Sequence, residues 1–168
     1  MRRVLYLVLL AYSLEGVSMS LLTRPEEEVV LCSPMEGRIT FEGKPAVGAK
    51  IQRFIKWKDQ VGEYDTVFTN DKGKFFLPEI KKKVKLNKIA TFAVAQEVRV
   101  LYMGIEYPIW VKSKREKGIY GELGGQPVNF RCELTDDLVP IELGDEAVGG
   151  SGLLASSCKW DSILKGGK

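Results

Sequence analysis

The chain has 168 residues, of which 45% are hydrophobic and 28% are charged, and its formal net charge is +3. This composition is typical of a folded domain, and the mild positive charge, without a long basic stripe, does not indicate nucleic-acid binding. The sequence contains no histidine. Nucleophiles activated by imidazole and catalytic zinc sites of the usual kind are therefore excluded.

The N-terminus has the pattern of a secretory signal peptide. Two arginines precede an apolar run over residues 4–14, and small residues follow it. The run is shorter than the about 20 residues that cross a bilayer, so we expect no stable membrane span. We expect residues 1–20 to be a signal peptide, residues 21–28 to be a linker, and the protein to be periplasmic or secreted. The alternative is a buried N-terminal strand or helix, because no Ala-x-Ala cleavage site is present.

Short β-type runs with turn residues between them follow this segment, and no stretch keeps a helical period over several turns. The predicted strands are residues 37–41, 49–57, 64–69, 74–77, 91–102, 105–111 and 127–134. In the second of these, Ile51, Ile55 and Trp57 share one face, although Arg53 interrupts the inward set. The pattern predicts an all-β domain, a β-sandwich of about seven strands, over residues 29–137.

Two turns are predicted to close hairpins. Residues 70–73 read Asn-Asp-Lys-Gly and separate the third and fourth strands, and Met103-Gly104 separates a later pair. Asn, Asp and Gly are the residues that tight turns need. The first turn is similar to the start of a calcium loop, but residues 74–76 supply no side-chain oxygen, so we expect no metal there.

Two later segments differ in composition. A basic loop between two strands is expected to contain Lys81, Lys82, Lys83, Lys85 and Lys88. Such a loop suits a solvated edge, and the functional alternative is contact with an acidic partner. Residues 138–168 are rich in Gly and Ser and are expected to form a loose C-terminal tail, unless Trp160 and apolar pairs dock on the domain.

The cysteines are Cys32, Cys132 and Cys158. Their spacing forms no C-x-x-C motif, which argues against a metal or redox site. In an oxidising compartment two of the three would pair, and we favour a disulfide between Cys32 and either of the others. The alternative is three buried, unreactive thiols.

Aromatic side chains near lysines are the candidate partner-binding residues. Trp57 lies between two lysines and Trp110 lies two residues before Lys112, while Tyr64 and Tyr107 lie in predicted strands. Exposed rings of this kind bind protein partners or sugars, and buried ones pack in the core. The carboxylate pairs that would suit glycoside cleavage or calcium are Asp71 with Glu79 and Asp136 with Asp137.

Two motifs resemble a known family. The stretches MEGRITFEGKPAVGAKIQR and TNDKGKFFLPEI are similar to carboxypeptidase regulatory-like domains, with Gly43 and Gly73 at turns and Phe75 and Leu77 directed into the core. The resemblance covers residues 35–80 and implies a transthyretin-like (prealbumin-like) β-sandwich. The later half also resembles a group of small uncharacterised bacterial domains. The known enzymes of this fold rely on histidine, so their activities are not expected here.

These observations favour a non-enzymatic, exported binding protein without a cofactor. Its most concrete form is a periplasmic immunity or accessory protein that binds a toxin delivered between bacteria, for instance by a type VI secretion system. The alternative is a module that binds carbohydrate or the cell envelope, and the third hypothesis is an enzyme that relies on carboxylates. The oligomeric state stays open, because exposed edge strands can pair with another chain.

Overall fold

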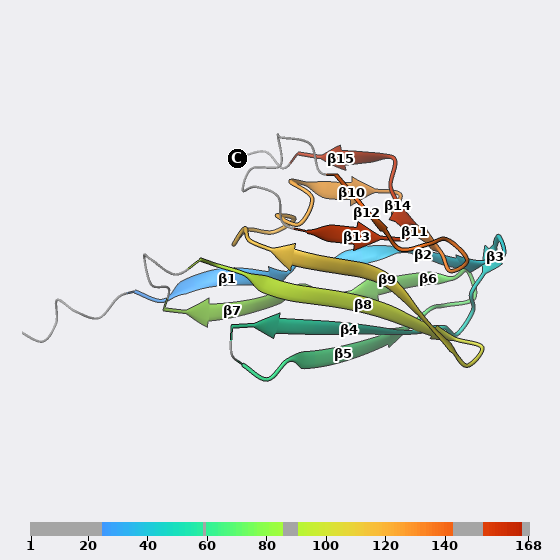
Figure 1. Ribbon diagram of the computed structural model, residues 1–168, viewed down its shortest axis with the longest axis horizontal. Coiled ribbons are helices and arrows are strands. Elements are labelled where there is room, and N and C mark those ends of the chain that lie inside the picture. Colours follow the sequence, from blue (N-terminus) through green and yellow to red (C-terminus); the bar gives the residue numbers. More distant parts are fainter. Residues whose placement is uncertain (1–24, 59, 86–90, 143–152, 166–168) are drawn as a thin grey trace, which may run out of the picture.

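A computed structural model describes residues 25–58, 60–85, 91–142 and 153–165. The expected signal peptide lies outside these residues. Every regular element within them is a β-strand (Figure 1). The longer strands are β1 (Glu27–Cys32), β2 (Met35–Phe41), β4 (Lys50–Trp57), β5 (Glu63–Phe68), β6 (Lys74–Leu77), β7 (Ile80–Val84), β8 (Val94–Tyr102) and β9 (Ile105–Lys114). The short strands are β3 (Lys44–Pro45), β10 (Gln126–Val128), β11 (Arg131–Glu133), β12 (Val139–Pro140), β13 (Leu154–Ser156), β14 (Cys158–Lys159) and β15 (Ser162–Leu164).

Two larger sheets contain most of these strands. One has six strands in the order β12-β13-β9-β8-β4-β5, and the other has five, in the order β14-β11-β2-β3 with β6 also paired to β2. Inward side chains of both sheets, such as Ile51 and Val98 from the first and Ile39 and Cys132 from the second, form one buried cluster. The architecture is therefore all-β and sandwich-like, as the alternating pattern predicts, although the described strands outnumber the expected seven.

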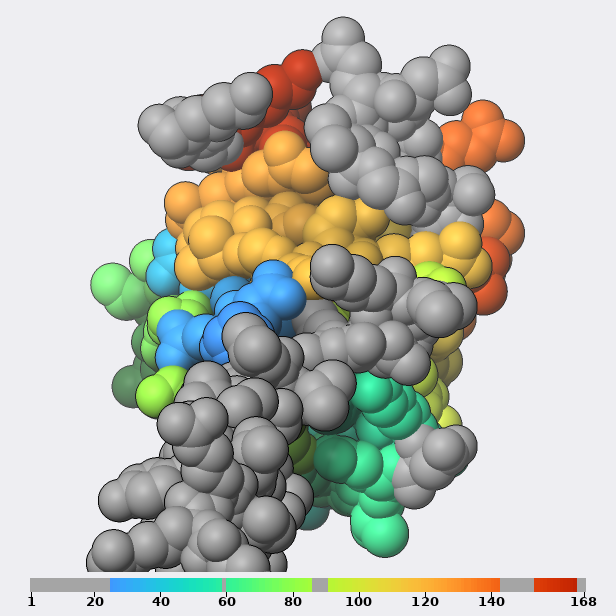
Figure 2. Space-filling view, turned by 90° about the vertical axis from the view of Figure 1, so that its left-hand side faces the viewer, coloured from blue at the N-terminus to red at the C-terminus, as the bar shows by residue number. Residues whose placement is uncertain are grey.

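A second buried cluster lies at one end of the molecule. Strands β1 and β7 form a two-stranded ribbon, and Val29 and Leu31 of β1 pack with Trp57 of β4. The segment that follows β9 closes this end, since the N–H of Val30 donates to the carbonyl of Lys117 (2.8 Å). Figure 2 shows the gold surface of this segment against the blue of β1. Within the described residues, no helix is long and apolar enough to cross a membrane.

One of the two predicted hairpins is confirmed and the other is wrong. Strands β8 and β9 pair across Met103 and Gly104, whose φ angles of 51° and 79° suit a tight turn. By contrast, β5 pairs with β4 and β6 pairs with β2, so residues 70–73 connect the two sheets. The turn chemistry itself is as expected, because Gly73 has a φ of 70° and Asn70 Oδ1 accepts from two backbone N–H groups. Such a turn also suits a crossing between sheets packed face to face.

The segments expected to be irregular contain further strands. The linker prediction is wrong at its last two residues, which begin β1, and the basic-loop prediction is wrong for Lys81, Lys82 and Lys83, which lie in β7. The loose-tail prediction is wrong for residues 154–164, because β13, β14 and β15 pair with β9, β11 and β10. Each of these strands is short or polar on one face, which explains why composition alone indicates a loop.

Candidate functional site

The outer face of the five-stranded sheet carries four cations in one row. Arg38 of β2 lies opposite Lys74 of β6 on one side and opposite Arg131 of β11 on the other. Arg131 in turn lies opposite Lys159 of β14. All four side chains are exposed, and residues that lie opposite each other in a sheet share a face. These four residues are called the cation row below.

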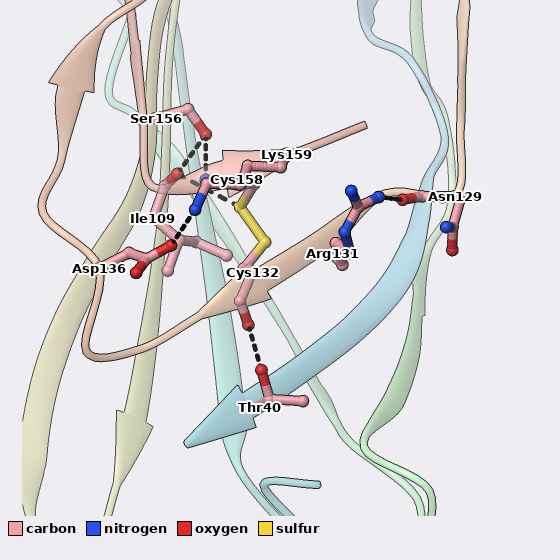
Figure 3. Close-up of a disulfide and its surroundings, with 9 residues drawn as sticks. All are labelled: Thr40, Ile109, Asn129, Arg131, Cys132, Asp136, Ser156, Cys158 and Lys159. Atoms are coloured by element: carbon pink, nitrogen blue, oxygen red, sulfur yellow. Dashed lines mark hydrogen bonds and ion pairs between the residues drawn. A yellow bond between two sulfur atoms is a disulfide. The ribbon is translucent and has the colours of Figure 1, made fainter. Parts of the chain in front are cut away.

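Acidic partners neutralise only one end of the cation row. Arg131 Nη1 lies 2.7 Å from Asp161 Oδ1, and Lys159 Nζ lies 2.7 Å from Asp136 Oδ2 (Figure 3 shows the second pair). Hydrogen bonds from Asn129 and Arg131 lower the pKa of Asp161 below its ordinary value, so this carboxylate stays charged. Neither of the other two cations forms an ion pair with a described residue. Like charges directly opposite each other repel, so this end of the row attracts an anion.

A groove opens along the cation row. Its wider part has a volume of about 530 Å³. The residues that line this part are Glu36, Gly37, Arg38, Lys74, Phe75, Pro127, Asn129, Phe130 and Arg131. A narrower part of about 180 Å³ shares Glu36 and Pro127 with it and adds the rings of Phe76 and Tyr120. The groove therefore combines three cations and one carboxylate with an aromatic end.

The groove exists because β2 loses its neighbour on one side. Strand β11 pairs with β2 only from Arg38 onward, so the first three residues of β2 have no described strand on that side. Asn129 has a φ of 56° and turns the chain from β10 into β11. The carbonyl of Phe130 accepts from Arg38 N–H (3.1 Å), and a Cβ on Gly37 would lie 2.4 Å from that oxygen. Glycine is thus required at the floor of the groove.

A disulfide between Cys132 and Cys158 lies on the buried side of the cation row (Figure 3). It joins β11 to β14 and so fixes the two strands that carry Arg131 and Lys159. The prediction that Cys32 takes part in a disulfide is wrong, because Cys32 lies in the second buried cluster, away from this pair. Burial raises the pKa of the Cys32 thiol to about 12, which makes it a poor nucleophile.

A buried polar network holds the segment that forms one wall of the groove. Ser33 donates to the Glu122 carboxylate from both its N–H (3.0 Å) and its hydroxyl (2.6 Å), and Gln96 Nε2 donates to it as well (2.9 Å). Lys114 Nζ lies 3.1 Å from the same carboxylate. The backbone N–H of Tyr120, a wall residue, donates to the Ser33 hydroxyl (2.6 Å). The network therefore links the wall to the core.

The charges and hydrogen bonds of this network suit a structural role. Burial alone would raise the pKa of Glu122, but the Lys114 ammonium and the hydrogen bonds from Ser33 and Gln96 lower it on balance. The adjoining cavity, lined in part by Ser33 and Trp110, has a volume of about 30 Å³. A space of this size holds about one water molecule and no organic substrate. We therefore assign the network to stability.

Among the described residues, none of the sequence-predicted partner-binding residues lines this groove, and the structure brings only Lys82 of β7 and Trp57 of β4 together from different strands. The exposed fractions of Trp57 and Trp110 are 7% and 2%, so both rings pack in the core, and the partner-binding alternative is wrong for these two residues. Trp57 lies on the same face of β4 as Ile51 and Ile55, and Trp110 lies opposite the buried Val98, next to a bulge in β9. Lys58 and Lys82 lie over the Trp57 ring, 4.4 and 5.8 Å from its centre.

The other predicted residues that the structure describes lie on β5, on β9, and on or just after β7. Tyr64 is 72% exposed on β5, and Tyr107 on β9 is half-buried against Phe41. On β7, Lys81 Nζ forms an ion pair with Glu79 (3.0 Å), and Lys83 is exposed. Lys82 donates to Gln60 (2.6 Å), Lys85 is exposed after β7, and Lys88 lies outside the described residues.

Sequence reasoning missed the cation row entirely. Its members come from β2, β6, β11 and β14, and only the register of these strands brings them together. No spacing along the chain signals such a row. The described residues also contain no group of three or more acidic or cysteine side chains placed to hold a metal ion.

The cation row is expected to lower stability. The Arg38→Gln variant should gain about 0.2–1 kcal/mol in free energy of unfolding at low salt, because it removes a cation between two others. The gain should shrink at high ionic strength, where charges are screened. Lys50→Gln is the matched control, since Lys50 lies between Leu101 and Phe68. Urea unfolding measures both, and an equal effect of the two substitutions would contradict this expectation.

The fold and the groove define a small all-β, sandwich-like domain with a cationic groove on the outer face of one sheet. A family model described as "Domain of unknown function (DUF6795)" matches residues 35–137, and the chain belongs to this family. The match includes Arg38, Lys74 and Arg131 of the cation row and ends before Lys159. Searches of curated proteins and of solved structures gave no match.

Proposed function

We propose that this chain is a non-enzymatic protein-binding domain whose groove receives an acidic segment of a partner protein. The cation row carries this proposal. Arg38 and Lys74 lie side by side without an acidic partner among the described residues, at a cost in repulsion that a bound anionic segment would offset. Arginine also forms two parallel hydrogen bonds with a carboxylate, which gives such binding a defined geometry.

The shape of the groove favours a length of polypeptide over a small molecule. It is open to solvent, and its two parts share Glu36 and Pro127, so its lining extends from the cations to the aromatic end. Phe76, which is 56% exposed, lies at the aromatic end and offers a hydrophobic contact beside the cations. Aromatic and arginine side chains are the groups that contribute most to protein–protein binding. The matching segment would place an apolar side chain next to two or more carboxylates.

We further propose that the protein is exported and has a transthyretin-like sandwich fold. The disulfide supports export, because such bonds persist in oxidising compartments. The most concrete form of the function is a periplasmic immunity or accessory protein that binds a toxin delivered between bacteria, for instance by a type VI secretion system. In this form the acidic segment belongs to the toxin, and binding blocks the toxin's action.

The two other hypotheses receive less support from the geometry. Sugar binding calls for exposed, coplanar rings, whereas Trp57 and Trp110 are buried and the half-buried Trp160 stacks on Phe130. Carboxylate catalysis of glycoside cleavage calls for two carboxyl groups across a cleft. Glu36 is the one carboxylate among the residues that line the groove.

Isothermal titration against the product of the adjacent gene tests the proposal. We expect tight binding by the wild type that weakens as salt is added, and loss of binding in the Arg38→Glu/Lys74→Glu variant. The Lys50→Glu/Lys56→Glu variant, which reverses the same number of charges on the outer face of β4, should bind as the wild type does. Unchanged binding by the groove variant would reject the groove as the site, and no binding by the wild type would reject the toxin assignment.

A further inference from the structure

Strand β5 is the longest edge strand of the two larger sheets among the described strands. It ends the six-stranded sheet and, among the described strands, pairs with β4 alone; in Figure 1 it lies at the lower margin of the molecule. Among the described strands, the other end strands of the two larger sheets are β3, β12 and β14, each two residues long, and β6, which has four residues and pairs with β2. Pro45 and Pro140 lie in β3 and β12, and Lys74 lies in β6. Short length, proline and lysine keep edge strands from pairing. Strand β5 has six residues and neither proline nor lysine. Its two charged residues are Glu63 and Asp65, and Asp65 accepts a hydrogen bond from the buried Arg53 (3.0 Å).

The backbone groups on the free side of β5 can be assigned from its ladder. Thr69 directly follows the strand. Its N–H donates to the carbonyl of Ala49 (3.0 Å), and its carbonyl accepts from the N–H of Gly48 (3.2 Å). Its backbone groups therefore point towards β4. Because successive residues of a strand alternate in this direction, the N–H and C=O groups of Tyr64, Thr66 and Phe68 point away from β4.

The side chains of the same three residues are exposed, and two of them, Tyr64 and Phe68, are aromatic. Tyr64 and Phe68 are 72% and 64% exposed on the outer face of the sheet, where the Tyr64 ring lies 4.7 Å from that of Phe54. Aromatic pairs across neighbouring strands stabilise a sheet. Both the backbone and the side chains of this edge are thus arranged for a further strand.

We propose that this strand is β5 of a second copy of the chain, antiparallel about a two-fold axis at Thr66. In this register Thr66 lies opposite its own copy, Tyr64 lies opposite Phe68, and Asp65 lies opposite Val67. Every outward N–H and C=O of β5 then has a partner. This interface is separate from the groove and does not depend on the function proposed for it.

The charged residues of β5 indicate which strand pairs with it and in which register. In a continuous sheet, residues that lie opposite each other must have their side chains on the same face. For two antiparallel copies of β5 this holds only if the two-fold axis lies at a residue, because a register shifted by one position would put opposed side chains on different faces. An axis at Asp65 would place two carboxylates opposite each other, which destabilises a sheet. The axis at Thr66 opposes no like charges, since Glu63 then meets Thr69. The sequence of this edge is therefore complementary to itself.

The mass of the full chain in solution, measured by analytical ultracentrifugation at micromolar concentrations, tests this proposal. We expect a dimer for the wild type and a monomer for Thr66→Lys, in which two ammonium groups would meet at the axis. Ala95→Lys is the matched control, because Ala95 is exposed on the outer face of β8, away from the edge, and it should remain a dimer. A monomeric wild type, or a dimer that Thr66→Lys leaves intact, would overturn the proposal.

Cysteine crosslinking tests the register independently of any loss of folding. Opposed residues of a hydrogen-bonded pair have Cα atoms about 5.5 Å apart, which suits a disulfide. A mixture of Tyr64→Cys and Phe68→Cys chains should therefore form a covalent dimer on mild oxidation, whereas each variant alone should not. Cys32 is buried and does not interfere. Equal crosslinking by one variant alone would contradict the register and the proposal with it.

Discussion

The Glu122→Gln variant is expected to lose about 3–5 kcal/mol of free energy of unfolding at neutral pH, because it leaves the buried Lys114 ammonium without its counter-charge. The loss should be large since both side chains lie inside the protein and 3.1 Å apart. Urea unfolding followed by tryptophan fluorescence measures it. Loosening of the wall of the groove should accompany the loss, since Glu122 holds Ser33, which in turn holds Tyr120.

Two comparisons isolate the effect of the buried charge. The Lys114→Met/Glu122→Gln variant removes both charges and keeps an acceptor for Ser33, so it should lose less than Glu122→Gln alone. Glu27→Gln breaks the exposed ion pair with Lys117 (2.9 Å) and should cost no more than about 1 kcal/mol. A double variant as unstable as the single one would show that hydrogen bonds, and not the ion pair, determine the stability of this network.

The same network gives stability a dependence on pH. The folded-state pKa of Glu122 is lowered, so its contribution is present above the pKa of an unfolded glutamate and is lost as the pH falls through the folded-state value. The difference in stability between the wild type and Glu122→Gln should therefore shrink in acid. A difference that stays constant down to strongly acidic pH would contradict a charged Glu122.

The second large effect is expected from the disulfide. Replacing Cys132 and Cys158 with serine should cost about 3–4 kcal/mol, because the bond closes a loop of 26 residues in the unfolded chain. For a chain of this size the loss corresponds to a fall of about 10 °C in melting temperature, which scanning calorimetry measures. In a strong reductant, the wild type should melt at the same temperature as the variant. If the melting temperature stays the same in the reductant and in the serine variant, this account is contradicted.

The core of the fold was accessible from the sequence where buried and exposed positions alternate along a strand, as they do in β4. Ile51, Ile55 and Trp57 are all buried on one face of β4, as the pattern predicts. Arg53, which interrupts that face, is buried too. It lies opposite Asp65 of β5 and donates to it (Nε to Oδ1, 3.0 Å), so the strand keeps its alternation at this position.

The parts that sequence reasoning missed depend on contacts between distant segments. Neighbours in sequence usually pair, which is why β5 and β6 were expected to form a hairpin, yet each finds its partner elsewhere. The disulfide and the cation row both require β14, which lies in the expected tail. Once β14 and β11 are paired, Cys158 meets Cys132 and Lys159 meets Arg131 in consecutive positions.

A residue-resolved titration tests the binding groove most directly. Backbone amide chemical shifts of the wild type would be followed while a short acidic peptide with one apolar residue is added. We expect saturable changes centred on residues 36–38, 74–76 and 126–131, which weaken as salt is raised. Strand β7, with three consecutive lysines, serves as the internal comparison. Changes centred on residues 81–83, with none in the groove, would contradict the account.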